Sequence, residues 1–368
     1  MKGEKRVFDL NTADAAVSFL LSDSFFSKFK YYRINIVSGG EPFLDKTALF
    51  QFVTVCERRF KENNKKVYIW LSTNGTLFSP EDVSFLSEHN VGFGISLDGV
   101  AEDNDSLRVY ADGSGCYKDV RENISEILAA DFLPPKAKQL WGLLVLTQKN
   151  LDIYKNVTHL KDIGFSTIQM RFVRTKDPSL SLSSLPSQKI AKTLIDFLTI
   201  AFTNAINGSP KLIHLIANQH DYIGKIILRL LLRVKTETRC SIGSYMFSFA
   251  ADGNIYPCDC FVGNPDFVLG NFYSSLDLEK LTKYRDISVH VRPKCKHCWA
   301  KFVCGGDCYH NSHIQNNNLL VPDATYCEII LPVIEATIAN VNKYQKENPT
   351  GYNKTIEYLR IREALKEK

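Results

Sequence analysis

Short apolar runs alternate with longer amphipathic segments through the first half of the chain. Five runs rich in β-branched and aromatic residues predict strands, at Arg33–Ser38, Val67–Ser72, Val91–Leu97, Leu140–Leu146 and Thr167–Phe172. Helical periodicity predicts helices between them, at Lys46–Lys61, Pro80–Glu88, Lys118–Ala130 and Leu151–Ile163. Strands separated by such helices are typical of βαβ units and a parallel sheet. Because a closed eight-unit barrel needs about 250 residues, five units predict an α/β fold with a partial, TIM-like (β/α) barrel.

The distribution of cysteine marks a change in character near residue 235. Cys56 and Cys116 are isolated, whereas the other eight of ten cysteines lie between Cys240 and Cys327. The sequence YLRIREALKEK that ends the chain predicts a charged, solvated helix. We therefore predict a β/α domain over 1–235, a cysteine-rich domain over 236–346 and a C-terminal helical tail over 347–368.

The composition excludes several classes of protein. With 45% hydrophobic and 23% charged residues and a formal net charge of only +5, the chain is typical of a soluble globular protein and gives no indication of a nucleic-acid partner. No apolar run approaches the roughly 18 residues of a membrane span, and no apolar signal core follows the basic N-terminus. We therefore expect a cytoplasmic protein without a membrane partner. Disulfides are rare in that compartment, so the cysteines need another explanation.

Polar and glycine-rich turns follow three successive predicted strands. They are Gly39-Gly40-Glu41-Pro42, Thr73-Asn74-Gly75 and Ser96-Leu97-Asp98-Gly99. Parallel β/α folds build their sites at the carboxyl ends of the strands, and glycine lets a backbone approach a ligand closely. One such turn alone indicates only a βα connection, but three at the same edge of the sheet indicate a ligand site.

The cysteines of the second half recur at short, regular intervals. The pattern is Cys295-x2-Cys298-x5-Cys304-x3-Cys308, with Cys240 and Cys258 before it and Cys327 after it. Thiolates at such spacings in a reducing compartment indicate a metal or cluster site. The spacing alone leaves zinc and iron–sulfur equally open, because thiolate sets bind both.

Two sets of motifs resemble known families. GGEP, STNGT and ISLDG, in this order, resemble the radical SAM superfamily, and DGNIYPCDCFVG, FVLGNF and CWAKFVCGGDCYH resemble the SPASM domain that carries its auxiliary clusters. The resemblance implies S-adenosylmethionine (SAM) as a ligand. It implies that the amine of SAM is bound by the first turn and its ribose and carboxylate by the third strand end, through Gly39, Gly40, Glu41, Ser96, Asp98 and Arg108.

The SPASM resemblance also implies two auxiliary four-iron, four-sulfur clusters. It assigns the outer cluster to Cys295, Cys298, Cys304 and Cys327, and the inner one to Cys240, Cys258 and Cys308. The eighth ligand stays open between Cys260, which would share a strand face with Cys258, and an iron that binds substrate directly. Asp259 matches a carboxylate that removes a substrate proton in sulfatase-maturing relatives.

One feature departs from the family. Radical SAM enzymes carry a Cys-x-x-x-Cys-x-x-Cys loop after their first strand, and its thiolates bind the cluster that cleaves SAM. Here no cysteine precedes Cys56, which lies in a helical pattern where a structural core role is expected. We therefore expect a chain that begins just past the loop and lacks the first barrel strand. A fragment of an active enzyme and a degenerate homologue both remain open.

The resemblance implies a radical SAM/SPASM maturase that takes a hydrogen from a side chain of a peptide or protein. CWAKFVCGGDCYH is most similar to maturases that build thioether crosslinks at peptide cysteines, whereas CDCFV is closer to sulfatase maturation. The auxiliary clusters would transfer electrons or bind substrate, and a flavodoxin or ferredoxin would act as the electron donor. A formylglycine-generating sulfatase-maturating enzyme is one alternative. A catalytically inactive, cluster-carrying partner that binds a peptide is another. A zinc-stabilised binding module is disfavoured by GGEP and SLDG.

Overall fold

The structure, a computed structural model, describes residues 9–37 and 40–366 and divides into two compact units. Unit 1 comprises Met1–Gly94 and Cys240–Ile287, and unit 2 comprises Ile95–Arg239 and Ser288–Lys368. Each unit therefore contains one segment from each half of the sequence. The boundaries expected near residues 235 and 346 follow composition rather than packing, and they stay a prediction.

Five strands form one sheet in chain order. They are β1 (Tyr31–Ile36), β2 (Lys66–Thr73), β3 (Gly92–Ser96), β4 (Trp141–Leu146) and β5 (Thr167–Phe172). The pairings of β1 with β2, β3 with β4 and β4 with β5 are parallel. Each predicted strand is confirmed to within two residues, apart from Ser38, which lies outside the described residues. Parallel strands joined through helices confirm the α/β class.

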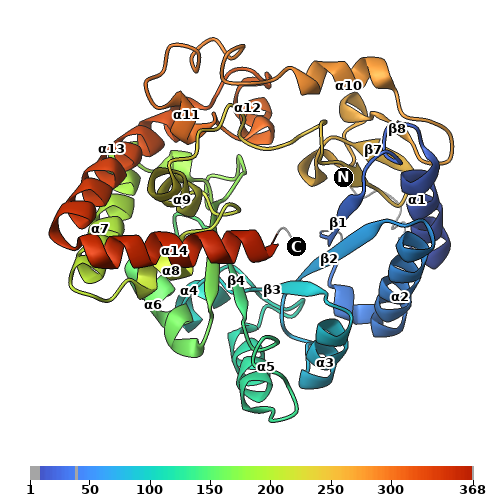
Figure 1. The fold of residues 1–368 in the computed structure, drawn as a ribbon, viewed down its shortest axis with the longest axis horizontal. Helices are drawn as coiled ribbons and strands as arrows, with labels where there is room; N and C mark the ends of the chain where they lie inside the picture. Colours follow the sequence, from blue (N-terminus) through green and yellow to red (C-terminus); the bar gives the residue numbers. More distant parts are fainter. Residues whose placement is uncertain (1–8, 38–39, 367–368) are drawn as a thin grey trace. The chain divides into compact units, whose positions relative to one another are not determined.

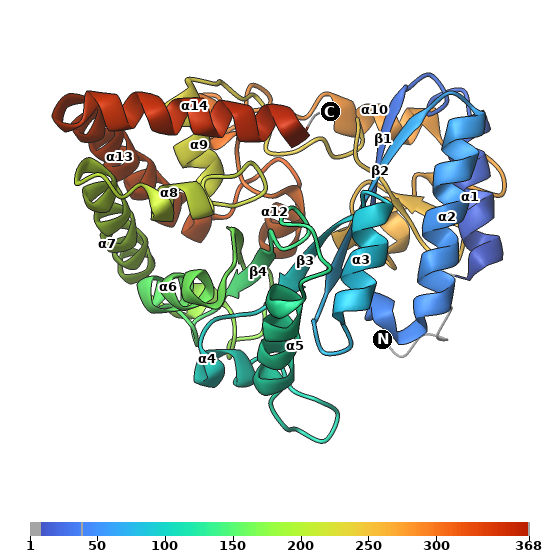
Figure 2. The same ribbon diagram turned by 60° about the horizontal axis from the view of Figure 1, so that its bottom comes forward.

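Unit 1 contains four helices among its described residues. They are α1 (Leu10–Ser22), α2 (Lys46–Glu62) and α3 (Pro80–Glu88), with α10 (Leu278–Arg285) from the second segment, and α2 packs against β2 and α1. Figures 1 and 2 both show α1 and α2 side by side. Helix α2 buries Leu49, Val53, Cys56 and Phe60, whose spacing places them on one helical face. Helix α3 begins at Pro80 as predicted, because Ser79 and Asp82 form a capping box.

The second segment of unit 1 contains a small antiparallel sheet and short 3₁₀ turns. The strands are β6 (Ser248–Phe249), β7 (Asn254–Tyr256) and β8 (Gly270–Asn271), and the turns are η3 (Asp259–Phe261) and η4 (Pro265–Phe267). A third turn, η1 (Pro42–Asp45), leads into α2 in the first segment. Aromatic rings bind the two segments, since Phe26 of the first contacts Phe247 at 4.9 Å and Phe249 at 5.9 Å between ring centroids.

Unit 2 is largely helical. Its helices are α4 (Ala101–Asp105), α5 (Tyr117–Ala129), α6 (Ile153–Ile163), α7 (Ser187–Ile206), α8 (Lys211–Ile216), α9 (Gly224–Leu232), α11 (Lys301–Cys304), α12 (Tyr309–Asn316), α13 (Ala324–Glu347) and α14 (Pro349–Lys366), with the 3₁₀ turn η2 (Leu182–Ser184). Helix α6 begins two residues later than predicted, because Asp152 caps it by accepting a hydrogen bond from the Lys155 amide at 3.0 Å.

Helices α7 and α13 form the helical core of unit 2 and lie side by side in Figures 1 and 2. Helix α13 is long and apolar enough to cross a membrane by length and composition alone, although no comparable run was expected from the sequence. Ile330, Val333 and Ile334 are almost fully buried on it. This is the packing of a core helix.

The C-terminal helix differs from its prediction as a solvated segment. Helix α14 begins at Pro349, earlier than the predicted Tyr358, and contacts α7, α9 and α13. Tyr352, Thr355 and Leu359 are buried, and the Thr355 hydroxyl lies 2.9 Å from the Tyr344 hydroxyl of α13. The prediction of a solvated helix was therefore wrong, because the helix buries a few residues at helical spacing that its many charges obscure.

Candidate functional site

The carboxylate of Glu41 is held at the carboxyl ends of β1 and β2 in unit 1. Its Oε1 accepts hydrogen bonds from the Thr73 hydroxyl at 2.6 Å and the Phe43 amide at 3.2 Å, and its Oε2 accepts one from the Asn74 amide at 2.6 Å. The first two glycine-rich turns therefore meet, as the sequence predicts. A carboxylate has about four lone-pair sites, so this fixed group can still accept a further hydrogen bond from a cation.

Open space lies beside Glu41. A Cβ placed on Gly40 would meet no heavy atom within 4 Å. Gly39, the other predicted glycine, lies outside the described residues. A turn of this kind leaves room for a ligand next to the carboxylate.

The residues predicted at the end of the third strand, Ser96, Asp98 and Arg108, lie in unit 2. Asp98 is only 3% exposed, and its carboxylate accepts hydrogen bonds from the Arg108 Nε at 2.7 Å and the Val145 amide at 2.8 Å. Ser96 is the last residue of β3 and is half-buried. The structure thus brings Asp98 and Arg108 together as an ion pair, and this pair fixes the turn.

Cys258, Asp259 and Cys260 form a compact group in unit 1. One possible ligand atom from each lies within 4.8 Å of the other two, and the Cys258 thiol donates a hydrogen bond to Asp259 Oδ1 at 2.9 Å. A hydrogen bond with Cys260, burial and the Asp259 carboxylate together raise the pKa of Cys258. Cys240 opens the same segment of the unit.

The reason given for placing Cys260 beside Cys258 is wrong. Cys258 precedes the 3₁₀ turn η3 and Cys260 lies within it, so the two cysteines do not alternate along a strand. The tight turn nevertheless brings both thiols to one side.

The remaining predicted cysteine ligands lie in unit 2. Cys295 and Cys304 are buried, and Cys327 lies in the first turns of α13. Burial, followed by neighbouring groups that include Cys304, Cys295 and Cys298, raises the pKa of Cys327 to about 12. These four thiols are therefore close enough to influence one another. Among the described residues, however, Cys258, Asp259 and Cys260 form the only cluster of three or more ligand atoms within 4.8 Å.

Two consecutive glycines shape the turn between Cys304 and Cys308. Gly305 and Gly306 have φ of 75° and 90°, a region that other residues rarely adopt. A Cβ on Gly305 would lie 2.6 Å from the Thr238 carbonyl, and one on Gly306 would lie 2.6 Å from Arg292 Nη1. The turn that separates the two thiols therefore requires glycine at both positions.

Sequence reasoning missed the cationic and aromatic side chains around these thiols. Arg174 Nη1 donates to Cys308 Sγ at 3.2 Å, and the Tyr326 hydroxyl lies 3.8 Å from Cys304 Sγ. Arg239 donates to the same hydroxyl at 3.1 Å. The only available signal was that Arg239 directly precedes Cys240.

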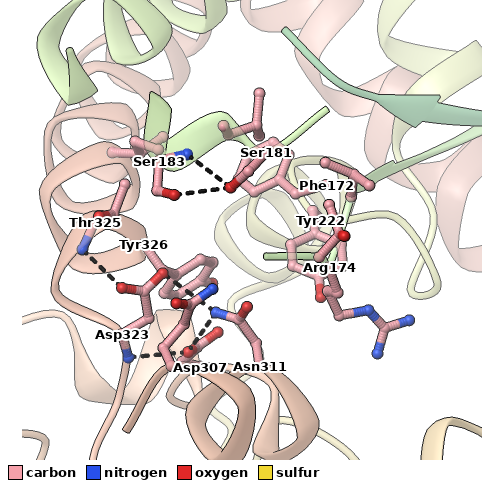
Figure 3. Close-up of a pocket in the computed structure, with 15 residues that line it drawn as sticks. Phe172, Arg174, Ser181, Ser183, Tyr222, Asp307, Asn311, Asp323, Thr325 and Tyr326 are labelled. Atoms are coloured by element: carbon pink, nitrogen blue, oxygen red, sulfur yellow. Dashed lines mark hydrogen bonds between the residues drawn. The ribbon is translucent and has the colours of Figure 1, made fainter. Parts of the chain in front are cut away.

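A small cavity of about 40 Å³ lies beside this group. Figure 3 shows Tyr222 and Tyr326 on its walls, with Asp307, Asn311 and Asp323 gathered on one side. Its volume is enough for one or a few water molecules. It therefore does not provide a pocket for a whole substrate.

Comparison with known families agrees with these sites. Residues 25–157 match the Radical SAM superfamily, and residues 240–299 match SPASM, described as an iron–sulfur cluster-binding domain. The chain is a radical SAM protein with a SPASM region. The first match contains the turns at Glu41 and Asp98, and the second contains the group around Asp259. The two regions imply iron–sulfur clusters and SAM as the cofactors of this radical SAM protein.

Several characterised proteins are similar to this radical SAM chain along most of their length. It is 26% identical to a cysteine-type anaerobic sulfatase-maturating enzyme of Clostridium perfringens over 73% of this chain and 72% of the relative. It is 22% identical to a serine-type anaerobic sulfatase-maturating enzyme of Bacteroides thetaiotaomicron, over 74% and 68%.

Solved structures confirm the fold. Native anSMEcpe with bound AdoMet matches with a TM-score of 0.73 and 21% sequence identity, covering 92% of this chain and 90% of that one. The same protein with bound AdoMet and Cp18Cys peptide matches with the same TM-score. The similarity extends over both the radical SAM and the SPASM regions, and it confirms the predicted partial barrel followed by a SPASM domain.

Proposed function

We propose that this chain is a radical SAM/SPASM maturase that modifies a cysteine or serine side chain of a peptide or protein. The observation that carries the proposal is the contact of Asp259 with Cys258 inside the SPASM region, 2.9 Å between Sγ and Oδ1. This contact supports the proposal, because Asp259 would act as a proton acceptor next to a thiol that would bind a cluster. The similarity to both cysteine-type and serine-type sulfatase-maturating enzymes supports the choice of substrate.

SAM would bind along the carboxyl ends of the strands. Glu41 would accept a hydrogen bond from the methionyl amine, since two backbone amides and one hydroxyl already orient its carboxylate. Gly39 and Gly40 would let the ligand approach the backbone. Ser96, Asp98 and Arg108 would face the ribose and carboxylate, with the ion pair between Asp98 and Arg108 keeping both side chains in one geometry.

Two four-iron, four-sulfur clusters would occupy the cysteines. The outer set is Cys295, Cys298, Cys304 and Cys327, and the inner set is Cys240, Cys258, Cys260 and Cys308. The match of residues 240–299 to an iron–sulfur cluster-binding domain favours iron–sulfur over zinc. The proximity of Cys260 to Cys258 favours Cys260 as the eighth ligand.

The chemistry would divide between the cofactors and the chain. When bound, SAM and the iron–sulfur clusters supply the radical and accept the electron that leaves the substrate. Asp259 Oδ1 would take the proton from the reacting side chain. In the structure this oxygen accepts from the Cys258 thiol, and a Cys258 thiolate that binds iron has no proton to donate. The carboxylate is then available as a base.

The partners and location follow from the same proposal. The substrate would be a peptide or protein, as in the peptide-bound structures of anSMEcpe. An electron donor such as a flavodoxin or ferredoxin would reduce the clusters in the cytoplasm. No membrane or nucleic-acid partner is proposed.

A second candidate function is that of an inactive, cluster-carrying partner that binds a peptide. It is considered because Cys56, a cysteine of the radical SAM match, is fully buried in α2. Burial raises the pKa of Cys56 to about 12, so this thiol is not suited to bind the cluster that cleaves SAM.

One experiment separates the two candidates. The protein is reconstituted anaerobically with iron and sulfide, then mixed with SAM, dithionite and a peptide that contains a cysteine. Release of 5′-deoxyadenosine together with loss of peptide mass supports the maturase. Two clusters with neither product supports the inactive partner. Stoichiometric zinc without iron would exclude both.

A further inference from the structure

Arg239 is a buried cation in unit 2 without a carboxylate in direct contact. It is 6% exposed, and its Nη1 donates to the Tyr326 hydroxyl. Its guanidinium carbon lies 4.2 Å from the Tyr222 ring centroid and 5.6 Å from that of Tyr326. Its Nη2 is buried and finds no acceptor among the described residues. A buried charge is unfavourable unless an opposite charge compensates it, so the surroundings of Arg239 call for an anion.

One group able to carry that negative charge is Cys304, which Arg239 reaches through the Tyr326 hydroxyl. Ionisable neighbours, Tyr326 and Tyr222 first and then Cys304 and Cys308, keep the pKa of Arg239 above its usual value despite burial. Tyr326 links the guanidinium to Cys304, because its hydroxyl lies 3.8 Å from Sγ. Arg239 thus neighbours one thiol on each side of the Gly305–Gly306 turn.

Two other arginines strengthen the positive field. Arg174 Nη1 donates to Cys308 Sγ at 3.2 Å, and Arg229 Nη1 donates to the Val303 and Cys304 carbonyls at 2.7 and 3.1 Å. Arg292 is fully buried nearby, but it donates to the Asp307 carbonyl and the Ser312 hydroxyl.

One buried carboxylate offsets part of this charge. Asp307 accepts hydrogen bonds from the Cys308 and Asp323 amides and from Asn311, which hold it in place. Asp323, which is half-buried, is a second carboxylate in the same group. The region keeps a net positive charge, because the carboxylates are outnumbered by three arginines, Arg174, Arg229 and Arg239.

We propose that Arg239 is a positioning residue shared by the two auxiliary clusters, which stabilises the reduced state of both through Cys304 and Cys308. The inference rests on the proposed function, which assigns these thiols to different clusters. Reduction adds one electron, and therefore one negative charge, to a cluster. A guanidinium stays protonated throughout, so it stabilises the added charge without transferring a proton. Field effects of this kind set cluster potentials.

The test is a redox titration of the reconstituted full chain, with dithionite as the electron source and electron paramagnetic resonance as the readout. In Arg239→Gln we expect the midpoint potentials of both auxiliary clusters to fall, with about a tenfold smaller reduced-to-oxidised ratio, or about 59 mV for one electron. Arg239→Lys should restore much of the loss. In Arg174→Gln only the cluster bound by Cys308 should shift.

Arg362→Gln is the matched control. Arg362 also lies over a tyrosine ring, that of Tyr358 at 5.7 Å, and donates to the carbonyls of His214 and Ala217. None of these contacts involves a thiol, so Arg362→Gln should leave the midpoint potentials of both clusters unchanged.

The outcomes are distinct. Unchanged potentials in Arg239→Gln and Arg174→Gln, with full iron content, overturn the inference and leave the proposed function intact. Absence of iron–sulfur clusters from the wild-type protein overturns the proposed function. If Arg239→Gln does not fold, Tyr326→Phe decides the question, because it removes the hydroxyl that links Arg239 to Cys304, and an unchanged outer-cluster potential counts against the proposal.

Discussion

The thiols of the two units have side-chain neighbours of opposite charge. In unit 1, Cys258 contacts the carboxylate of Asp259, whereas in unit 2, Cys308 contacts the guanidinium of Arg174 and Cys304 lies near Arg239. A carboxylate beside a thiol can accept a proton, and a cation beside a thiol stabilises negative charge. Under the proposed function, proton removal would belong to the thiols of unit 1 and the stabilisation of negative charge to the thiols of unit 2.

The scaffolds that carry the two sets also differ. Cys258 and Cys260 lie at a 3₁₀ turn of three residues, whereas Cys327 lies on the 24-residue helix α13. Helix α13 packs against α7 and α14. A short turn can adjust when a substrate binds, while a packed helix keeps its thiol in place.

The largest effect is expected from removing the carboxylate of unit 1. Asp259→Asn should lower turnover by about 10²- to 10⁴-fold, the usual contribution of a general base, and leave the iron content unchanged. Peptide modification followed by mass spectrometry measures it. Asp266→Asn, an exposed carboxylate of the same unit, is the control and should be fully active. Normal turnover in Asp259→Asn would remove the proposed difference between the two sets.

Loss of a thiol should have a similar effect on iron in both units. Cys298→Ala should reduce the iron content by about half, because one of two clusters loses a ligand. Cys260→Ala should do the same if Cys260 is the eighth ligand of the inner cluster. Iron analysis and visible absorption measure the change. Full iron content in Cys260→Ala would show instead an inner cluster with an open iron.

Cys327 lies on a packed helix, whereas Cys258 and Cys260 lie at a short turn. We therefore expect that loosening the helical packing affects the cysteines of unit 2 and not those of unit 1. Leu359 of α14 is fully buried, so Leu359→Ala should lower the free energy of unfolding by about 2–5 kcal/mol. Urea denaturation measures it. Hydrogen exchange should become faster in α13 around Cys327 and stay unchanged in η3. Glu357→Ala, an exposed position on the same helix, should have little effect on either measurement.

The smallest effect concerns Cys56, a buried thiol of unit 1 outside both cysteine sets. Burial raises its pKa to about 12 in the folded protein, whereas an unfolded cysteine ionises near 8.5. Below about pH 8 the Cys56 thiol is protonated in both the folded and the unfolded state, so this group does not make the free energy of unfolding depend on pH. As the pH rises further, the unfolded state loses its proton first and the folded state becomes less stable. Urea midpoints between pH 7 and 10 should therefore fall less steeply in Cys56→Ala than in the wild-type apoprotein.

Much of the fold could be predicted because its signals are local. The apolar run Thr167–Phe172 predicts β5 without error, and Pro80 at a capped helix start predicts α3. Helix α14 was misjudged because its charges dominate the pattern, while two of the helices that it contacts, α7 and α9, lie far away in the sequence. The interleaving of the two units could not be predicted, since composition changes once near residue 235 and packing follows contacts instead.

Some residues of the candidate site could likewise be predicted from the sequence, and others could not. The cysteines, Glu41 and Asp259 are visible in the sequence because their motifs are compact. The contact between Arg239 and Tyr326 joins residues 87 positions apart, and that between Arg174 and Cys308 joins residues 134 positions apart. No spacing rule predicts such pairs, so the charges that distinguish the thiols of the two units emerge only from the folded chain.

The Gly305–Gly306 turn has a consequence for protein engineering. Both residues adopt backbone angles that disfavour a side chain, and each faces an atom that a methyl group would strike. In a library that randomises these two codons, nearly every surviving clone should encode glycine at both. Inserting a single residue between Cys304 and Cys308 should be equally damaging. The length and the glycine content of this loop are therefore both fixed. A designer who grafts the segment onto another scaffold should transfer it without changes.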